Sequence, residues 1–375
     1  MSATAADFYF NNRLEAVLYG EGKVASLGRE LERRGARRAL IVTGKTLGRS
    51  RLLEQVKQAC GNALAGAFTG TAQHVPSKTV LALADEARRL EADALVSFGG
   101  GSPNDCAKAA IMNVIKSGGR EIILIAIPTT LSAGEFTPAG GITDEATMIK
   151  GGVADARLMA RAVILDPVMT TETPAWLWAS TAMRSLDHAV ESSYSSRHQP
   201  FTDTLAARAI AMLDEHLMPS LKGGGDELEH RLQCQLAAWF SIFGMNNTRA
   251  GISHALGHQI GPRWNVPHGV TSCITLPHVM RFMAGVAPER FAPIAQGLGL
   301  RFDASNPKMA AQECADRVAR FIGKFEVPNR LRDVGVAREE IGSIAETVLE
   351  EVKRSNTVGR EVTTANLLEI LEAAY

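Results

Sequence analysis

The pattern of apolar and polar positions divides the chain into two parts that predict different structures. Up to about residue 165, short aliphatic and β-branched runs alternate with amphipathic segments. The runs predict strands over 39–43, 63–68, 94–98 and 122–127. The segments between them predict helices over 23–34, 51–59, 77–90 and 104–115, with Ser77 as an N-cap and Gly35 ending the first helix. Strands alternating with helices indicate a parallel sheet covered on both faces.

After Asp166-Pro167 the strand pattern nearly disappears and helical periodicity takes over. It predicts helices over 174–194, 201–221, 226–243, 251–260 and 270–283, followed by several more up to residue 375. We therefore predict an α/β N-terminal domain with a parallel sheet over residues 1–167 and an all-α C-terminal domain over residues 168–375. Three consecutive glycines at 223–225 predict a linker inside the helical part.

Composition excludes several classes of protein. The 40 Lys+Arg residues balance the 40 Asp+Glu residues, whereas binding to nucleic acid or to anionic membranes favours a basic excess. The five cysteines form no C-x-x-C pair, which favours a reducing compartment. The longest strongly apolar run, residues 122–128, is far shorter than the roughly 20 residues that cross a bilayer. We expect a cytoplasmic protein that binds neither nucleic acid nor membrane.

A glycine-rich turn follows the predicted strand 94–98 and leads into a helix. Gly99, Gly100 and Gly101 allow a ligand to approach the backbone, and the helix start at Ser102 offers unpaired N–H groups at the positive end of the helix dipole. A pyrophosphate fits such a turn without Lys or Arg. A tight strand-to-helix connection explains the glycines equally well, because the turn is neither G-x-G-x-x-G nor a Walker motif.

Hydroxyl groups follow the next predicted strand, 122–127, at the carboxyl edge where α/β sheets bind ligands. Thr129, Thr130 and Ser132 would bind a ribose or a phosphate there, with ordinary loop hydrogen bonding as the alternative.

The first predicted strand, 39–43, ends at Gly44 and Lys45. An acidic residue near this point would normally bind ribose hydroxyls and repel a 2′-phosphate. Because Gly44 does neither and Lys45 is positive, we expect NADPH to be tolerated as well as NADH.

Four of the nine histidines are candidates for chemistry. His254 and His258 are four residues apart, which places them on one face of a helix. His268 follows in a predicted turn, and His188 lies on an upstream helix. Converging imidazoles predict a divalent transition metal or general acid–base chemistry, whereas a lone histidine is more often a buried structural residue.

These motifs resemble the iron-containing alcohol dehydrogenase superfamily over nearly the whole chain. Residues 99–109 fit its G-G-G-S-x-x-D-x-x-K-A motif, which includes Asp105, and His254, His258 and the segment 267–269 fit its second motif. Residues 18–22 are similar to its N-terminal turn, and residues 162–167 are similar to its inter-domain strand and the D-P turn that follows. The resemblance implies NAD(P) on the N-terminal domain, an active site in the cleft between the domains, and a homodimer.

In metal-dependent members, the resemblance implies that an Asp and three His bind the metal. His188, His254 and His268 occupy the histidine positions, and His258 matches an additional active-site histidine. The Asp position is Arg184, which cannot ligate a cation and would repel one. Asp187 lies about 100° further around the helix and is not expected to replace the missing ligand. We therefore expect no metal, with iron or zinc on the three histidines as the alternative.

Residues 128–138 have the shorter spacing found in the maleylacetate reductase branch, which also lacks the Asp and works without metal. The segment 188–191 resembles that branch too, whereas residues 267–269 have the Pro-His-Gly sequence of the wider family. This branch is the closer of the two resemblances.

We therefore predict an NAD(P)H-dependent reductase of a small oxo-acid, similar to the enzyme that converts maleylacetate to 3-oxoadipate in the degradation of aromatic compounds. Arg184 would stabilise negative charge or bind a substrate carboxylate, unless it only pairs with an acid such as Asp187. His254 or His258 would donate the proton, and His188 completes the catalytic set. The alternatives are a metal-dependent alcohol or polyol dehydrogenase and a non-catalytic nucleotide-binding relative.

Overall fold

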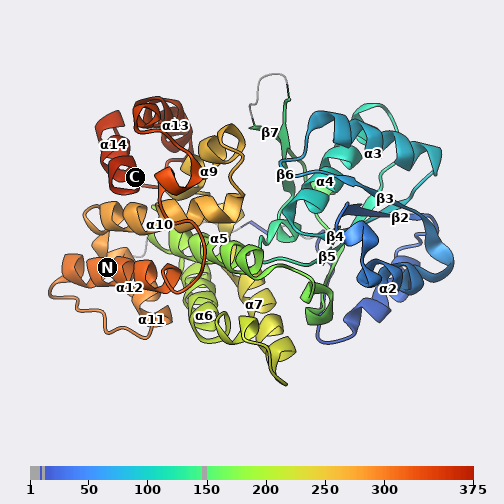
Figure 1. The fold of residues 1–375 in the computed structure, drawn as a ribbon, viewed down its shortest axis with the longest axis horizontal. Helices are drawn as coiled ribbons and strands as arrows, with labels where there is room; N and C mark the ends of the chain where they lie inside the picture. The colour runs from blue at the N-terminus through green and yellow to red at the C-terminus, as the bar shows by residue number, and fades with distance from the viewer. Residues whose placement is uncertain (1–8, 11–12, 146–149) are drawn as a thin grey trace. The chain divides into compact units, whose positions relative to one another are not determined.

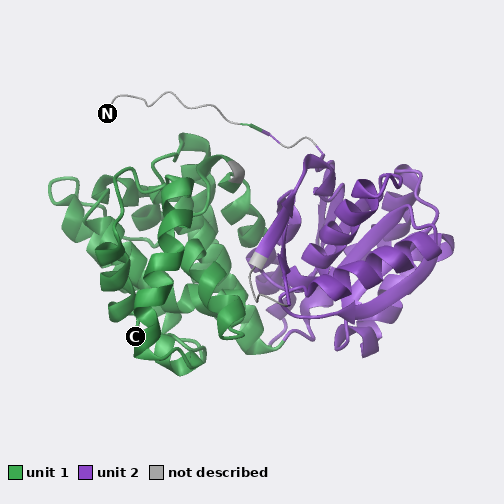
Figure 2. Ribbon diagram, turned by 90° about the horizontal axis from the view of Figure 1, so that it is seen from above, with its two compact units in different colours: residues 1–9, 174–223, 236–375 green, residues 10–173, 224–235 purple. Residues whose placement is uncertain are grey.

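A computed structural model describes residues 9–10, 13–145 and 150–375. The chain forms two compact units (Figure 2). The sheet unit consists of residues 10–173 and 224–235, and the helical unit consists of residues 1–9, 174–223 and 236–375. The predicted domains divide at 167/168. The chain leaves the helical unit at the predicted glycine linker, because residues 224–235 belong to the sheet unit.

The sheet unit is built on six parallel strands in the order β1-β8-β5-β4-β2-β3 (Figure 1). The strands are β1 (Ala16–Tyr19), β2 (Ala39–Gly44), β3 (Leu64–Thr71), β4 (Ala94–Gly99), β5 (Ile123–Pro128) and β8 (Ala162–Leu165). Four of them were predicted from apolar runs, and β8 coincides with the inter-domain strand that the family resemblance implied. The predicted parallel α/β architecture is confirmed.

Helices cover both faces of this sheet, which is why β4 is buried along its whole length. They are α1 (Leu27–Arg33), α2 (Arg51–Cys60), α3 (Ser77–Arg89) and α4 (Gly101–Lys116). On one face, apolar residues of α1 and α2 such as Leu31 and Val56 pack with Val96 and Ile125 of the strands.

Two details of these helices test local predictions. Gly35 has a φ of 71° and follows Arg34, the C-cap residue of α1, as its predicted role requires. The prediction of Ser77 as an N-cap is wrong, because Pro76 precedes the helix in the cap position. The Ser77 hydroxyl instead donates to the carbonyl oxygen of Thr143 at 3.2 Å, so a tertiary contact takes the place of the local cap.

An antiparallel hairpin was not predicted. It pairs β6 (Ala139–Thr143) with β7 (Lys150–Ala154). Two of these ten residues are alanine and four are glycine, so the segment lacks the β-branched pattern from which strands are recognised.

The helical unit confirms the predicted all-α architecture. Its helices are α5 (Ala175–Tyr194), α6 (Pro200–His216), α8 (Met245–Thr248), α9 (Ile252–Arg263), α10 (His268–Ala284), α11 (Ala292–Gly297), α12 (Pro307–Ile322), α13 (Ile341–Ser355) and α14 (Thr364–Ala373), together with the end of α7 (Glu227–Ile242). α5 is buried from Trp178 to Tyr194, so even its polar side chains must find partners inside the protein.

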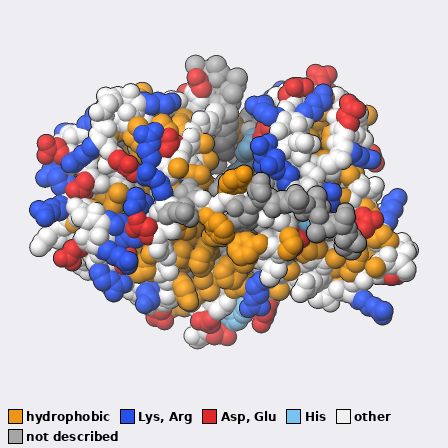
Figure 3. All heavy atoms as spheres, turned by 180° about the vertical axis from the view of Figure 1, so that it is seen from behind, with side chains coloured by type: hydrophobic (Ala, Val, Ile, Leu, Met, Phe, Trp, Pro, Cys, Tyr) orange, Lys and Arg blue, Asp and Glu red, His pale blue; other side chains and the backbone are white. Residues whose placement is uncertain are grey.

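The helices and the surface charge can be compared with the predictions from composition. Among the described residues, no helix is both long enough and apolar enough to cross a membrane. Basic and acidic side chains are interspersed over the face shown in Figure 3, as the balanced charge suggests.

Candidate active site

The predicted glycine-rich turn joins β4 to α4. Gly99 has a φ of 144°, a backbone conformation that residues other than glycine rarely adopt. A Cβ on Gly100 would lie 3.0 Å from Oγ1 of Thr130. At Gly101 a Cβ would meet nothing closer than Ser132 at 3.7 Å. The backbone conformation therefore demands glycine at the first position, and the Thr130 side chain leaves little room for a Cβ at the second. The third position leaves space above the start of α4.

The predicted hydroxyl groups lie beside this turn. β4 and β5 pair in register up to Gly99 and Pro128, and the backbone N–H of Thr129 donates to the carbonyl oxygen of Gly99 at 3.0 Å. Oγ1 of Thr130 and Oγ of Ser132 are 2.9 Å apart. The structure thus brings together Gly99–Ser102 and Thr129–Ser132 at the carboxyl edge of the sheet, where ligands bind in α/β folds.

Two other motif residues have structural partners. Oδ2 of Asp105 accepts a hydrogen bond from the backbone N–H of Gly141 at 3.0 Å, which attaches α4 to the hairpin. Lys108 is fully buried and donates to the carbonyl oxygens of Gly134, Thr137 and Ala139 at 2.6–2.8 Å. Burial lowers the pKa of Lys108 to about 8. These contacts fix the segment after β5 to α4.

Sequence reasoning missed Asn104, which follows the turn in α4. Its side chain is 3% exposed, and both amide atoms lack a hydrogen-bond partner among the described residues. A buried amide with no partner is rare and costs free energy. Such a group beside the glycine turn is a candidate for contact with a bound polar ligand, although Asn alone in a motif position gave no signal in the sequence.

Gly44 ends β2, as predicted, at the same edge of the sheet. The nearest atom to a Cβ at this position would be the carbonyl oxygen of Thr71, at 3.4 Å. The position can therefore accept a small side chain.

The four predicted histidines lie together in the helical unit. The ring centroids of His188 and His254 are 4.9 Å apart, and those of His254 and His268 are 6.5 Å apart. The rings of His258 and His268 are parallel at 5.4 Å. His268 was expected in a turn but is the first residue of α10, after Pro267 in the cap position.

Glu191 holds His254 in place. One Glu191 oxygen accepts from the backbone N–H of Gly251 and the other from that of Ser253, each at 2.8 Å, at the start of α9. The imidazole Nδ1 of His254 then donates to Oε2 of Glu191 at 2.7 Å. With its Nδ1 hydrogen directed to the carboxylate, neutral His254 has its lone pair on Nε2.

His258 has a carboxylate partner from another helix. Its Nδ1 donates to Oε1 of Glu351 on α13 at 2.6 Å, and both side chains are about one-third exposed, at 35% and 33%. His258 and His268 are therefore the partly exposed histidines of the cluster, whereas the His254 side chain is only 4% exposed.

Arg184 is buried inside this cluster. Its Nη2 donates to Nε2 of His268, and its Nη1 donates to Oγ of Ser272 at 3.2 Å. Nη1 also lies 3.5 Å from Oδ2 of Asp187. Arg184 therefore forms a long ion pair with Asp187, which was the alternative role expected for it. Burial lowers the pKa of Arg184 to about 10, which still leaves the guanidinium charged at neutral pH.

Asp187 lies closer to the histidines than expected. Its Oδ2 accepts from the hydroxyls of Ser253 and Ser272 at 2.8 and 2.6 Å and is 3.7 Å from Nδ1 of His254. Burial raises the pKa of Asp187 to about 7, with a further contribution from the charge of Glu191. The helical wheel excluded Asp187 from the face of His188, but it did not account for α9 packing against its other side.

His188 is held neutral. Burial, the neighbouring His254 and the charge of Arg184 lower its pKa well below 6.5. Its Nδ1 is buried and has no hydrogen-bond partner among the described residues.

The residues present do not fit a metal on His188, His254 and His268. The lone pair of His268 Nε2 accepts the Arg184 N–H, so it is not available to a cation, and the guanidinium would repel one. Asp187, Glu191 and His254 form a second candidate set, with ligand atoms within 4.8 Å of one another. A cation there would have to replace the hydrogen bond between His254 and Glu191.

The sheet with its glycine turn and the helical unit with its histidine cluster together define an oxidoreductase of the alcohol dehydrogenase type. Residues 15–167 match the iron-containing alcohol dehydrogenase family, and residues 178–375 match the C-terminal part of the Fe-containing alcohol dehydrogenase family. The chain belongs to the iron-containing alcohol dehydrogenase family and is an enzyme of that family.

Relatives within this family differ in their reactions. The NAD-dependent methanol dehydrogenase of Bacillus methanolicus is 32% identical, over 96% of this chain and 98% of its own. A maleylacetate reductase of Delftia acidovorans is also 32% identical, over 89% of this chain and 88% of its own. The crystal structure of an iron-containing alcohol dehydrogenase from Corynebacterium glutamicum has a TM-score of 0.85 and 27% identity, over 100% of this chain and 97% of its own.

Proposed function

We propose that the protein is an NAD(P)H-dependent reductase of a small oxo-acid, similar to maleylacetate reductase, that works without a metal. The observation that carries this proposal is Arg184, a buried guanidinium in contact with His268 and 3.5 Å from Asp187. In the metal-dependent members that the sequence resembles, an acidic ligand occupies this position. Here a fixed positive charge of the protein occupies it.

The sheet unit fits a dinucleotide. The turn at Gly99–Ser102 would hold the pyrophosphate at the start of α4, where backbone N–H groups and the helix dipole favour an anion. Asn104 supplies a buried amide without a partner among the described residues, and Thr130 and Ser132 supply hydroxyls. When bound, the nicotinamide supplies the hydride.

Arg184 would act on the substrate in two ways. Reduction leaves negative charge on a substrate oxygen or enolate, and a buried cation that is already in place stabilises such charge. A guanidinium also binds a carboxylate through two parallel hydrogen bonds, which favours an acidic substrate. Ser272 and His268 hold the guanidinium, so it does not have to be ordered when the substrate binds.

The proton would come from His254 or His258, and the structure favours His258. His258 is the more exposed of the two and is bonded to Glu351, so it can exchange protons with water after each turnover. The Nε2 of His254 would then orient the substrate, because Glu191 fixes its ring. His188, which stays neutral, would contribute an uncharged imidazole beside the reacting group.

The relatives support both the nicotinamide cofactor and the oxo-acid substrate of the proposal. A methanol dehydrogenase named as NAD-dependent and a maleylacetate reductase are each 32% identical to this chain. A homodimer and a role in the degradation of aromatic compounds rest on the family resemblance alone.

A screen of reductase activity tests the proposal. Oxo-acids, including maleylacetate, and simple aldehydes would be offered with NADH and with NADPH, to EDTA-treated protein and to protein loaded with iron or zinc. We expect turnover of oxo-acids, unchanged by EDTA. Nucleotide binding without turnover of any substrate would instead identify a non-catalytic relative.

A metal-dependent alcohol dehydrogenase is the second candidate, and the set Asp187, Glu191 and His254 favours it. Elemental analysis separates it from the first. One tightly bound iron or zinc per chain, with activity lost on chelation and restored by the metal, would contradict the metal-independent proposal.

A further inference from the structure

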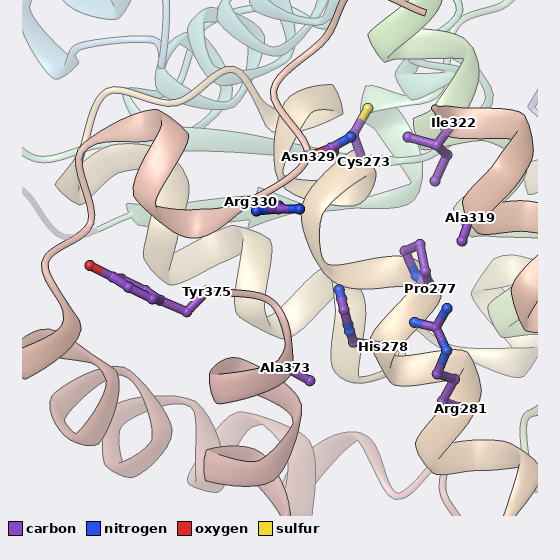
Figure 4. Close-up of a pocket in the computed structure, with 10 residues that line it drawn as sticks. All are labelled: Cys273, Pro277, His278, Arg281, Ala319, Ile322, Asn329, Arg330, Ala373 and Tyr375. Carbon is purple, nitrogen blue, oxygen red and sulfur yellow. The ribbon is translucent and has the colours of Figure 1, made fainter. Parts of the chain in front are cut away.

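A pocket of about 380 Å³ lies in the helical unit and contains none of the four histidines of the candidate active site (Figure 4). α10 supplies Cys273, Pro277, His278 and Arg281, and Arg330 enters from the segment that follows α12. His278 is ten residues after His268 on the same helix, which corresponds to about 15 Å along the helix axis. The pocket is therefore a separate site.

Two guanidiniums, those of Arg281 and Arg330, lie in the polar part of the pocket. Arg281 lies 3.0 Å from Oδ1 of Asp316, but both side chains are about half exposed, so the pair is weak. Arg330 is exposed and forms no ion pair with the residues that the structure describes. Burial and the charge of Arg281 keep His278 uncharged at neutral pH, with a pKa of about 4. Of the two guanidiniums, Arg330 is the one without an ion-pair partner among the described residues, so it is the group that an anionic ligand would neutralise.

The remaining walls are mostly apolar. Pro277 and Ile322 face the pocket from α10 and α12, together with the thiol of Cys273 and two alanines. A pocket of this volume and lining suits a small organic molecule, with the apolar part of the ligand against the helices and a few polar groups fixing its orientation.

We propose that this pocket binds a small organic monocarboxylate with an apolar body. Arg330 would bind the carboxylate, Arg281 would assist by turning from Asp316, and the apolar walls would cover the rest of the ligand. Because only one guanidinium has no ion-pair partner among the described residues, one carboxylate is favoured over a dicarboxylate. This site is distinct from the substrate carboxylate proposed at Arg184 and does not depend on that proposal.

Calorimetric titration of the full-length protein with benzoate tests the site, with benzamide as a neutral probe of nearly the same shape. We expect saturable binding of benzoate and binding of benzamide weaker by about tenfold or more, since the amide offers no charge to the guanidinium. Arg330→Gln should weaken benzoate binding by a similar factor. Arg332→Gln, an exposed arginine two residues away that does not line the pocket, is the matched control and should leave binding unchanged.

Arg184→Met separates the two carboxylate sites. If benzoate binds in the pocket, this variant retains wild-type affinity for benzoate whether or not the proposed function is correct. Loss of benzoate binding in Arg184→Met, with Arg330→Gln unaffected, would overturn the proposal. Equal affinity for benzamide and benzoate, or no saturable binding of benzoate, would overturn it as well.

Discussion

Lys108 in the sheet unit and Arg184 in the helical unit are both buried cations, and their partners differ. The ammonium of Lys108 donates to three backbone carbonyl oxygens, which saturates its three N–H donors. Arg184 has five donors, and its recorded partners are the side chains of Ser272, His268 and Asp187. A cation held by the backbone maintains a fold, whereas one held by a cluster of titratable side chains is typical of a chemical site.

This difference separates motif residues that serve the fold from those that serve catalysis. Lys108 belongs to the recognisable G-G-G-S-x-x-D-x-x-K-A motif, yet its contacts only secure the segment after β5. Arg184 fits no motif, because it is a departure from the metal-dependent pattern. Substitutions at the two positions should therefore change different measured quantities.

The largest effect is expected for Arg184→Met. Loss of the buried charge should lower kcat/KM for an oxo-acid by about 10²–10³-fold, the range seen when one group that stabilises an oxyanion is removed. Steady-state kinetics measure this, and Arg208→Met, an exposed residue of α6, is the control. Kinetics close to wild type would show that Arg184 is only a structural partner of Asp187.

Lys108→Met should instead reduce stability. Three buried carbonyl oxygens lose their donor, and we expect the free energy of unfolding to fall by about 3 kcal/mol. Urea denaturation measures it, with Lys116→Met, exposed on the same helix, as the control. If Lys108→Met unfolds like the control, the contrast between the two cations is lost.

Gly44→Asp tests whether cofactor choice belongs to the sheet unit. A carboxylate at the end of β2 should weaken NADPH binding by about tenfold more than NADH binding, through repulsion of the 2′-phosphate. Fluorescence titration of both cofactors measures it. Gly44→Ala, which adds the Cβ without the charge, should affect the two cofactors equally. An equal loss for both cofactors in Gly44→Asp would contradict the assignment of this turn.

The smallest effect is expected for His278→Gln, which tests a partly buried group outside the histidine cluster. The pKa of His278 is lowered to about 4 by burial and by Arg281. Between that value and the unfolded value of about 6.5, only the unfolded chain binds the proton, so stability is lost as the pH falls. Allowing for its partial exposure to solvent, wild type should lose about 1 kcal/mol more than the variant between pH 7 and 5. Parallel losses would show that His278 titrates normally.

The sequence predicted the architecture because the buried strands β2, β4 and β5 are continuous aliphatic runs. It missed β1 and the β6–β7 hairpin because the four residues of β1 are too few for a pattern and the hairpin is rich in glycine. A strand that is buried on both faces needs apolar residues, so its sequence identifies it. An edge strand is held mainly by backbone contacts, which many different sequences can make.

The sequence indicated the individual histidines of the candidate site but not the hydrogen bonds that join them to carboxylates on other helices. The spacing of His254 and His258 and the family resemblance identified the imidazoles. The Glu191 contact with the start of α9 and the Glu351 contact with His258 join distant helices. No local pattern in the sequence indicates which carboxylate will orient which histidine, because that depends on how α5, α9 and α13 pack.

The return of residues 224–235 to the sheet unit affects how this chain can mature on the ribosome. Arg231 donates to the carbonyl oxygen of Thr170 at 3.1 Å, and Gln235 donates to that of Pro128 at 3.4 Å. Both acceptors are synthesised before α5 and α6, but their donors appear only afterwards. The sheet unit therefore stays incomplete while two helices of its neighbour emerge, and the edge that carries Pro128 is finished only when the first half of α7 has been made.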